Sequence, residues 1–316
     1  MRLAIRHISR FRFDDNATHA LQRLRLRPPG GPGQTVRAWQ VTIDGVEPTV
    51  GYADGLGNRI DLVRHDRGER PEVVVIAAGV VETQDRAGIV GSADDYAVPW
   101  IFERTTGFTQ AGERVLSIAA ALPLEHRSLD ALHWLMSEVH ARIRYAPELA
   151  DADADTDAEH ALEAGEGTSR DHAHAFIAVA RALKIPARYV AGYLLTDGPL
   201  QRIAETMQQA GGAQQSQRMP LEADGIRHLA ADAPEAVARQ QQTSVTTYPP
   251  SGHAWAEAYV EGLGWVGFDP FMNRCPDERY VRVAAGLDHT DARPVTGIGA
   301  SPVAVEISVI QSPELV

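Results

Sequence analysis

Three residues of the types that perform acyl-transfer chemistry lie far apart in the chain, namely Ser169, His253 and Asp269. Ser169 ends the glycine-bracketed turn Gly165-Glu-Gly-Thr-Ser169 and falls in the first turn of a predicted helix. The unpaired N–H groups and the dipole at a helix N-terminus favour a developing anion, which suits a nucleophile. On propensity alone, however, Thr168 or Ser169 is more simply an N-cap. The other two residues must decide between these interpretations.

His253 and Asp269 are predicted to lie on neighbouring strands of one hairpin. The segment His253–Val260 alternates strictly between large and small side chains, a glycine-containing turn follows, and the chain returns to Asp269. Closing the hairpin at Val260 and Trp265 places Asp269 within about three residues of direct pairing with His253. A carboxylate at that distance can hold an imidazole in one tautomer, as a general base requires.

Helices and one further strand must position these groups. From Ala173 the apolar residues recur at 176, 177, 180 and 183, which predicts a helix with one buried stripe. Ile185-Pro186 stops this helix, and an apolar strand follows over 188–195. Upstream, helical periodicity is found over 115–122, 129–143 (with Ser128 as a cap) and 159–164.

The first 95 residues have a different character and predict a β-sandwich-like domain. Short alternating or apolar segments are separated by Gly- and Pro-rich turns, as in a sandwich of antiparallel strands. Strands are expected over 2–13, 24–27, 36–43, 59–63 and 73–81. We therefore expect an α+β protein with two domains, residues 1–95 and 96–316. A Gln-rich insertion at about 198–250 interrupts the second domain, and a connection of this length predicts either a mobile segment or a lid.

Composition narrows the classes of partner and compartment. The net charge of −12 over 316 residues argues against nucleic acid as the main partner. Cys275 is the only cysteine, which excludes an internal disulfide and a thiolate metal cluster. The chain has no apolar run of membrane-spanning length, so no membrane partner is expected, and no signal-peptide pattern opens it. A cytoplasmic location is the expectation.

Two patterns that suggest cofactors fail in their context. Gly262-Leu-Gly-Trp-Val-Gly267 matches a dinucleotide-binding pattern, but it lies inside the hairpin and no helix follows it. His172 and His174 are two residues apart on a helix and point about 200° apart, so they cannot both face one ion together with Asp171. We expect neither a cofactor nor a metal.

The order of these motifs resembles the transglutaminase-like superfamily of papain-type thiol enzymes, in its bacterial branch with a β-rich N-terminal region. The resemblance covers nearly the whole chain apart from the insertion. It rests on Gly167-Thr-Ser-Arg-Asp-His-Ala-His174, Ile185-Pro-Ala-Arg-Tyr-Val-Ala-Gly-Tyr193, His253-Ala-Trp-Ala-Glu257, Gly264-Trp-Val-Gly-Phe-Asp-Pro270 and the tail around Tyr280–Gly286. It implies a papain-like core in which the helix that bears the nucleophile packs on an antiparallel sheet.

The resemblance also implies an activity. The family member would be a cysteine peptidase or amidase that transfers an acyl group from a peptide or isopeptide amide to water or an amine. His253 would act as general base and then as general acid, and Asp269 would orient it. A peptide or protein substrate is the expected partner.

The chain departs from the family at the nucleophile, because Ser169 stands where the family has cysteine. A thiol beside an imidazole ionises near neutral pH, whereas a hydroxyl must lose its proton during attack. Cys275 lies in a Pro-flanked loop beyond the hairpin and cannot replace it. The serine is either an engineered replacement or natural, and since His253 and Asp269 are both retained, replacement is favoured. We expect this form to be inactive or weakly active, with a non-catalytic peptide-binding homologue as the alternative.

Overall fold

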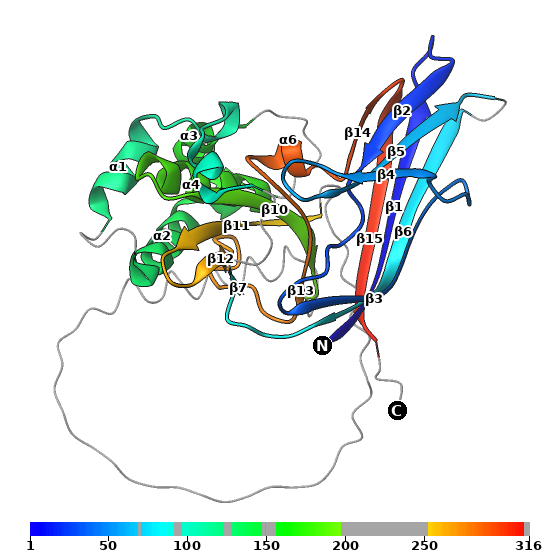
Figure 1. Cartoon of the computed structure of the whole chain (residues 1–316). Coiled ribbons are helices and arrows are strands. Elements are labelled where there is room, and N and C mark those ends of the chain that lie inside the picture. Colours follow the sequence, from blue (N-terminus) through cyan, green and yellow to red (C-terminus); the bar gives the residue numbers. More distant parts are fainter. Residues whose placement is uncertain are drawn as a thin grey trace, which may run out of the picture.

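The structure, a computed structural model, describes residues 1–68, 71–91, 97–122, 128–146, 149, 156–196 and 252–312. Figure 1 shows a long, narrow group of strands beside a compact body of helices and strands. The Gln-rich insertion expected at 198–250 lies outside the described residues. Within the described part, no helix is both long enough and apolar enough to cross a lipid bilayer.

Two four-stranded sheets form the strand-rich part. One has the order β15-β1-β6-β3 and the other the order β14-β2-β5-β4. Alternating apolar side chains of both sheets, including Phe11, Leu24 and Val75, share one buried core, as in a β-sandwich. The strands are β1 (Arg2–Phe13), β2 (His19–Leu24), β3 (Gln34–Ile43), β4 (Val50–Ala53), β5 (Arg59–Asp66), β6 (Glu72–Thr83), β14 (Val295–Ile298) and β15 (Ala300–Gln311).

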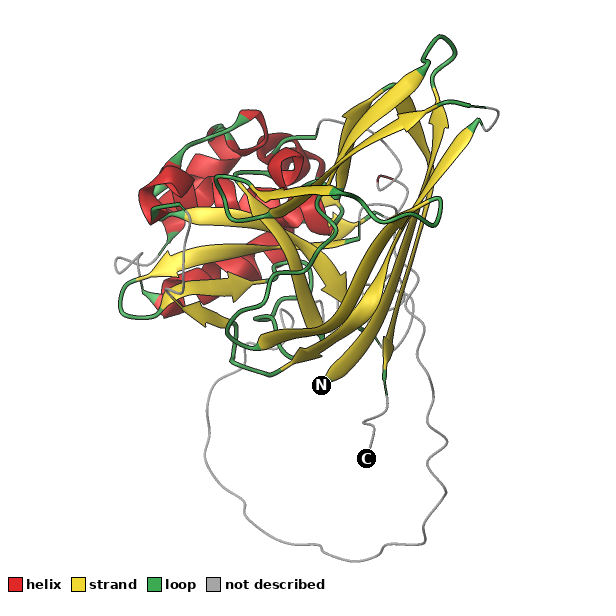
Figure 2. Ribbon diagram, turned by 45° about the vertical axis from the view of Figure 1, so that its right-hand side comes forward, coloured by secondary structure: helices red, strands yellow, loops and turns green. Residues whose placement is uncertain are grey.

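The second part contains a five-stranded antiparallel sheet of order β13-β10-β11-β12-β7, with helices gathered on one face (Figure 2). Its strands are β7 (Ile89–Gly91), β10 (Ala187–Leu194), β11 (His253–Val260), β12 (Gly264–Phe268) and β13 (Tyr280–Gly286). Its helices are α1 (Glu113–Ala121), α2 (Leu129–Arg142), α3 (Ala158–Ala164), α4 (Ser169–Ala182) and α6 (His289–Ala292), with the 3₁₀ turns η1 (Pro99–Glu103) and η2 (Gly107–Thr109). A short parallel pair joins β8 (Arg144–Tyr145) to β9 (Glu166–Gly167). The expected α+β class and the helix-on-sheet core are confirmed.

Helix α4 is buried on every side, and not only along the single stripe that its periodicity predicts. One face packs on β11 and β12, where Phe176 stacks on Phe268 with ring centroids 5.2 Å apart. The remaining faces carry alanines, which leave room for α1, α2 and α3 to pack closely. The buried Arg181 is tolerated because its guanidinium donates to three backbone carbonyls and to the Thr109 hydroxyl. A central helix held from all sides is a rigid support for its first residues.

Sheet pairing crosses the expected division after residue 95. Strands β14 and β15, which that division assigns to the second domain, pair with β2 and β1 of the sandwich. In the other direction, β7 precedes residue 95 yet pairs with β12 of the five-stranded sheet. Local periodicity indicates that a segment is a strand, but it does not indicate which distant strand it joins.

Candidate active site

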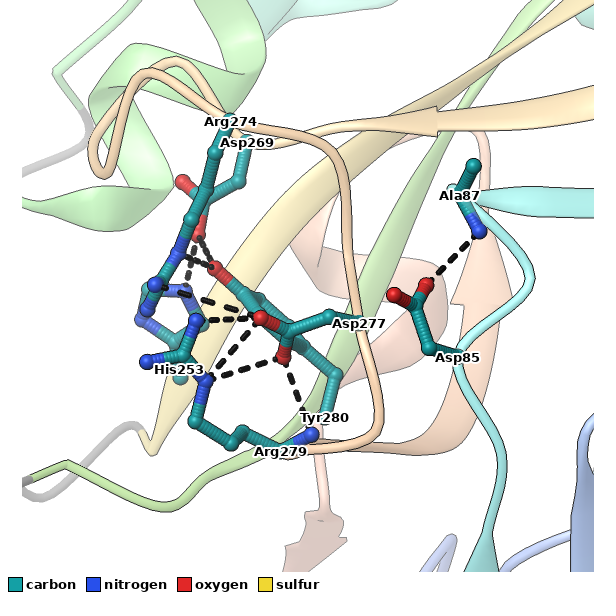
Figure 3. A network of polar contacts seen from close by, with 8 residues as sticks. All are labelled: Asp85, Ala87, His253, Asp269, Arg274, Asp277, Arg279 and Tyr280. Carbon is teal, nitrogen blue, oxygen red and sulfur yellow. Dashed lines mark hydrogen bonds and ion pairs between the residues drawn. The ribbon is translucent and has the colours of Figure 1, made fainter.

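His253 and Asp269 form a direct, fully buried hydrogen bond (Figure 3). His253 Nε2 lies 2.7 Å from Asp269 Oδ2, and neither side chain is exposed to solvent. Because a carboxylate only accepts, Nε2 carries the proton and donates it. The other ring nitrogen, Nδ1, is buried and has no hydrogen-bond partner among the described residues. The pair therefore presents an imidazole with one nitrogen fixed and the other available as a base.

Asp269 is held by more than the histidine. Its Oδ1 accepts from the backbone N–H of Met272 at 3.0 Å, and its backbone pairs with Arg274 in both directions. Its Oδ2 accepts a second hydrogen bond, from the Tyr280 hydroxyl at 2.8 Å. Burial raises the pKa of Asp269, but the neighbouring His253 and these donors outweigh that effect and hold the pKa below its usual value. The carboxylate is therefore kept ionised.

Ser169 is the first residue of α4, and it is not the residue that caps this helix. The N-cap is Thr168, whose backbone N–H and hydroxyl both donate to Asp171 Oδ2, at 2.7 and 2.8 Å. Thr168 and Asp171 thus form the cap of this helix, and Ser169 has no capping role. Ser169 is 8 % exposed, so it lies at the edge of the buried region. Of the two residues that the simpler interpretation offered as the N-cap, Thr168 has that role and Ser169 does not.

The start of α4 and the His253 ring meet at a common neighbour, Phe271. The ring centroid of Phe271 lies 5.8 Å from that of His253 and 5.5 Å from that of His172, in the first turn of α4. His172 is fixed in turn, because its ring nitrogens lie 2.7 Å from the Thr168 carbonyl and 2.9 Å from the Ile143 carbonyl. The structure thus joins His253 to Asp269 directly and to the segment that carries Ser169 through one aromatic ring. No hydrogen bond joins Ser169 to His253, both of which lie in the described chain.

The histidines of the α4 motif have structural positions. His174 is buried and stacks on Phe108, with ring centroids 5.3 Å apart, and its Nε2 accepts from the backbone N–H of His289. Burial lowers the pKa of His174 well below its usual value, so it is neutral. Among the described residues, no group of three or more His, Cys, Asp and Glu side chains is arranged to hold a metal ion.

Cys275 lies in the loop after β12, where its Sγ is 3.3 Å from His133 Nε2. Burial, assisted by the negative charge of Asp269, raises the pKa of its thiol to about 11. Such a thiol is protonated at neutral pH and is a poor nucleophile. This agrees with the expectation that Cys275 does not replace a thiol at position 169.

A cavity of about 650 Å³ lies behind the His253–Asp269 pair. Its wall includes Trp255 and Tyr280, whose rings contact the His253 ring, but none of Ser169, His253 and Asp269 lines it. Residues of the sandwich also line it, from the segment 29–34 and from the segment 51–61, which joins β4 to β5. Beside Trp255, the buried Glu257 bonds to Arg188 at 2.6 Å and to Arg282 at 3.1 Å. The cavity is therefore separate from the three candidate residues.

The chain is similar to known proteins over both parts. Residues 118–270 match the Transglutaminase-like superfamily, and residues 3–82 match the Bacterial transglutaminase-like N-terminal region. The two matches show a transglutaminase-like core preceded by a bacterial transglutaminase-like N-terminal region. An uncharacterized protein of Mycobacterium leprae is 24% identical, covering 98% of this chain and 97% of that protein. One of Mycobacterium tuberculosis is also 24% identical, covering 94% of this chain and 87% of the relative.

A solved structure shares the whole transglutaminase-like fold. It is the crystal structure of a "putative cysteine protease" from Cytophaga hutchinsonii, with a TM-score of 0.67 and 16% identity, covering 100% of this chain and 92% of that one. At this identity the likeness shows the fold alone. The match to the transglutaminase-like superfamily contains Ser169, His253 and Asp269 but ends before Tyr280. Sequence reasoning did not assign Tyr280 a role, because its only signal is a tyrosine at the start of an apolar strand.

Proposed function

We propose that this chain has the catalytic framework of a thiol-type acyl-transfer enzyme that acts on peptide or isopeptide amides, with Ser169 at the nucleophile position. The observation that carries the proposal is the His253–Asp269 hydrogen bond, which leaves the buried Nδ1 of His253 without a partner. An unpartnered buried nitrogen costs stability. A protein that only binds a peptide gains nothing from a buried imidazole that is held in one tautomer at this cost.

In this mechanism the side chain at position 169 attacks the amide carbonyl carbon, and His253 Nδ1 takes its proton. The C–N bond then breaks, and the leaving amine receives that proton from His253. Water repeats the sequence on the acyl-enzyme and releases the acid. Asp269 keeps the imidazolium oriented, and the backbone N–H of Ser169, at the positive end of α4, forms part of the oxyanion site. Hydrolysis is favoured over transfer to an amine because water is always present.

The hydroxyl at position 169 limits this chemistry. A thiol beside imidazole transfers its proton before attack, whereas a serine hydroxyl holds its proton near neutral pH. We therefore expect the Ser169 form to bind amide substrates and to turn them over slowly or not at all. This limit is also what favours the second candidate, a peptide-binding protein without catalysis in which Ser169 is natural.

The decisive experiment needs no known substrate. In Ser169→Cys, alkylation by iodoacetamide is followed from pH 5 to 9 by intact mass, beside Ser169→Cys/His253→Ala and the unchanged chain. We expect one thiol that reacts rapidly at pH 6 and loses this reactivity when His253 is removed, because the thiolate–imidazolium pair survives at acid pH. A new thiol that reacts only above pH 8, regardless of His253, would contradict the catalytic framework.

Turnover is then assayed with Ser169→Cys on a mixture of peptides and isopeptide-linked peptides, with mass detection of products and of the acyl-enzyme. Hydrolysis by Ser169→Cys but not by the double variant supports the proposal. A reactive thiol pair with no acyl-enzyme on any peptide, together with peptide binding by the unchanged Ser169 chain, supports the binding protein instead.

A further inference from the structure

The carboxylate of Asp269 is the centre of a polar network that continues beyond the three candidate residues (Figure 3). Each carboxylate oxygen has two lone pairs. On Oδ2, His253 Nε2 occupies one at 2.7 Å and the Tyr280 hydroxyl occupies the other at 2.8 Å. The Tyr280 ring also lies against the ring of His253, with centroids 5.8 Å apart. Tyr280 thus contacts both members of the pair.

Tyr280 is itself held from the loop that follows Asp269. The Nε of Arg274 donates to the Tyr280 hydroxyl oxygen at 3.2 Å, and its guanidinium lies 5.6 Å from the ring centroid. Arg274 is fixed because its backbone pairs with that of Asp269 in both directions. Donation by Arg274 to the hydroxyl oxygen polarises the O–H bond, and this strengthens the bond that Tyr280 donates to Asp269.

We propose that Tyr280 is a positioning residue of this active site, which, supported by Arg274, fixes Asp269 Oδ2 in the direction of His253. This role rests on the proposed function, and it adds a fourth side chain to Ser169, His253 and Asp269. Tyr280 is buried with 5 % of its surface exposed, and together with Trp255 it lines the cavity.

The consequence concerns the protonation of Asp269. The titratable or charged groups that face Asp269 are His253 from β11, Tyr280 from β13, and Arg274 and Cys275 from the loop. Tyr280 is a donor that stays protonated at ordinary pH, because burial raises its pKa well above the usual value. Removal of its hydroxyl takes one donor from the ionised carboxylate and raises the pKa of Asp269.

The test uses Tyr280→Phe, which removes the hydroxyl and retains the ring. Tyr193→Phe is the matched control, because Tyr193 is a buried tyrosine whose hydroxyl bonds to His7 Nδ1 at 2.9 Å, away from Asp269. In the unchanged Ser169 background, ¹³C NMR titration of the Asp269 carboxyl carbon should give a higher apparent pKa in Tyr280→Phe and no change in Tyr193→Phe. This measurement requires no catalysis, so it distinguishes failure of this inference from failure of the proposed function.

In the Ser169→Cys background, kcat of Tyr280→Phe should fall about tenfold with KM within about twofold, since one charge-assisted hydrogen bond is lost away from the substrate. The acid limb of the kcat profile should move to higher pH, and Arg274→Gln should move it in the same direction by less. Tyr193→Phe should alter none of these. An unshifted Asp269 titration in Tyr280→Phe, or an equal shift in Tyr193→Phe, overturns the inference.

Discussion

The side-chain amide of Asn58 pairs with the backbone of Ala285 as a neighbouring strand would. Asn58 Nδ2 donates to the Ala285 carbonyl at 2.7 Å, and its Oδ1 accepts from the Ala285 N–H at 2.8 Å. Gln34 makes the same two bonds to Arg282, at 2.9 and 2.8 Å. Two amides of the sandwich thus cover the edge of β13, the strand that begins with Tyr280.

Asn58→Ala should destabilise the protein by about 2 to 4 kcal/mol, because it leaves the buried N–H and carbonyl of Ala285 without partners. Urea unfolding measures the change in the free energy of unfolding. Asn16→Ala, at an exposed turn position, is the control and should change the free energy of unfolding by less than about 0.5 kcal/mol. Equal stability of the two variants would show that the edge of β13 does not depend on this amide.

Glu257→Gln should cost about 3 to 5 kcal/mol, because it leaves Arg188 and Arg282 around a neutral side chain in a buried site. Burial raises the pKa of Glu257, but the two arginines outweigh this and lower it below the usual value. A lowered carboxyl pKa contributes stability at neutral pH that is lost as the pH falls through the folded-state value. The free energy of unfolding should therefore fall less steeply with acidification in Glu257→Gln than in the unchanged chain. Glu306→Gln, which breaks an exposed ion pair with Arg10, is the control and should change the free energy of unfolding by less than about 1 kcal/mol.

The local elements of the core were predictable because helices and hairpins carry their signals within a short stretch. The expected helix 129–143 with its Ser128 cap corresponds to α2, where Ser128 Oγ accepts from the Ala131 N–H at 3.2 Å. The hairpin was also predictable, although its register differs by one residue. Val260 pairs with Gly264 and not with Trp265. This brings Asp269 one residue nearer to His253 than expected.

The other features of the fold and of the candidate site depend on contacts between separate segments, for which one sequence contains no local signal. Nothing in the periodicity of β15 indicates that it pairs with β1 across most of the chain. The hydroxyl of Tyr280 bonds to Asp269, although the strand that begins with Tyr280 pairs with β10 and not with the hairpin. Ser169 as a candidate nucleophile depended on His253 and Asp269 together with the family resemblance, since propensity alone favoured a cap at Thr168 or Ser169. Thr168 and Asp171 supply that cap in the structure.

His7, in the sandwich, should be a second residue that makes the stability of the protein fall at acid pH. It lies between the Tyr193 hydroxyl and Ser9 Oγ, and burial lowers its pKa from 6.5 to about 4. Below pH 6.5 the unfolded chain binds a proton that the folded chain refuses, so stability falls until the pH approaches 4. By pH 4.5 this loss should reach about 2 to 3 kcal/mol. Urea unfolding at pH 7 and 4.5 should show that His7→Gln loses less of its free energy of unfolding between these pH values than the unchanged chain does. His19→Gln, at an exposed position, should behave like the unchanged chain. A loss of the same size in His7→Gln would exclude His7 as its source.

Cys275 should alkylate slowly in the folded chain, and this determines how clearly a thiol at position 169 can be detected. With a thiol pKa of about 11, its thiolate fraction at pH 8 is roughly a hundredfold below that of free cysteine, and its rate with iodoacetamide should fall in proportion. Unfolding in urea should restore the ordinary rate. Asp269→Asn should accelerate the alkylation of Cys275 in the folded chain, because the negative charge of Asp269 contributes to the raised pKa of the thiol. His133, 3.3 Å from the sulfur, would instead increase the reactivity if its protonated form stabilised a thiolate. Fast alkylation of the folded chain that is lost in His133→Ala would therefore mean that Cys275 is an activated thiol, and position 169 would no longer be the only place for a thiol nucleophile.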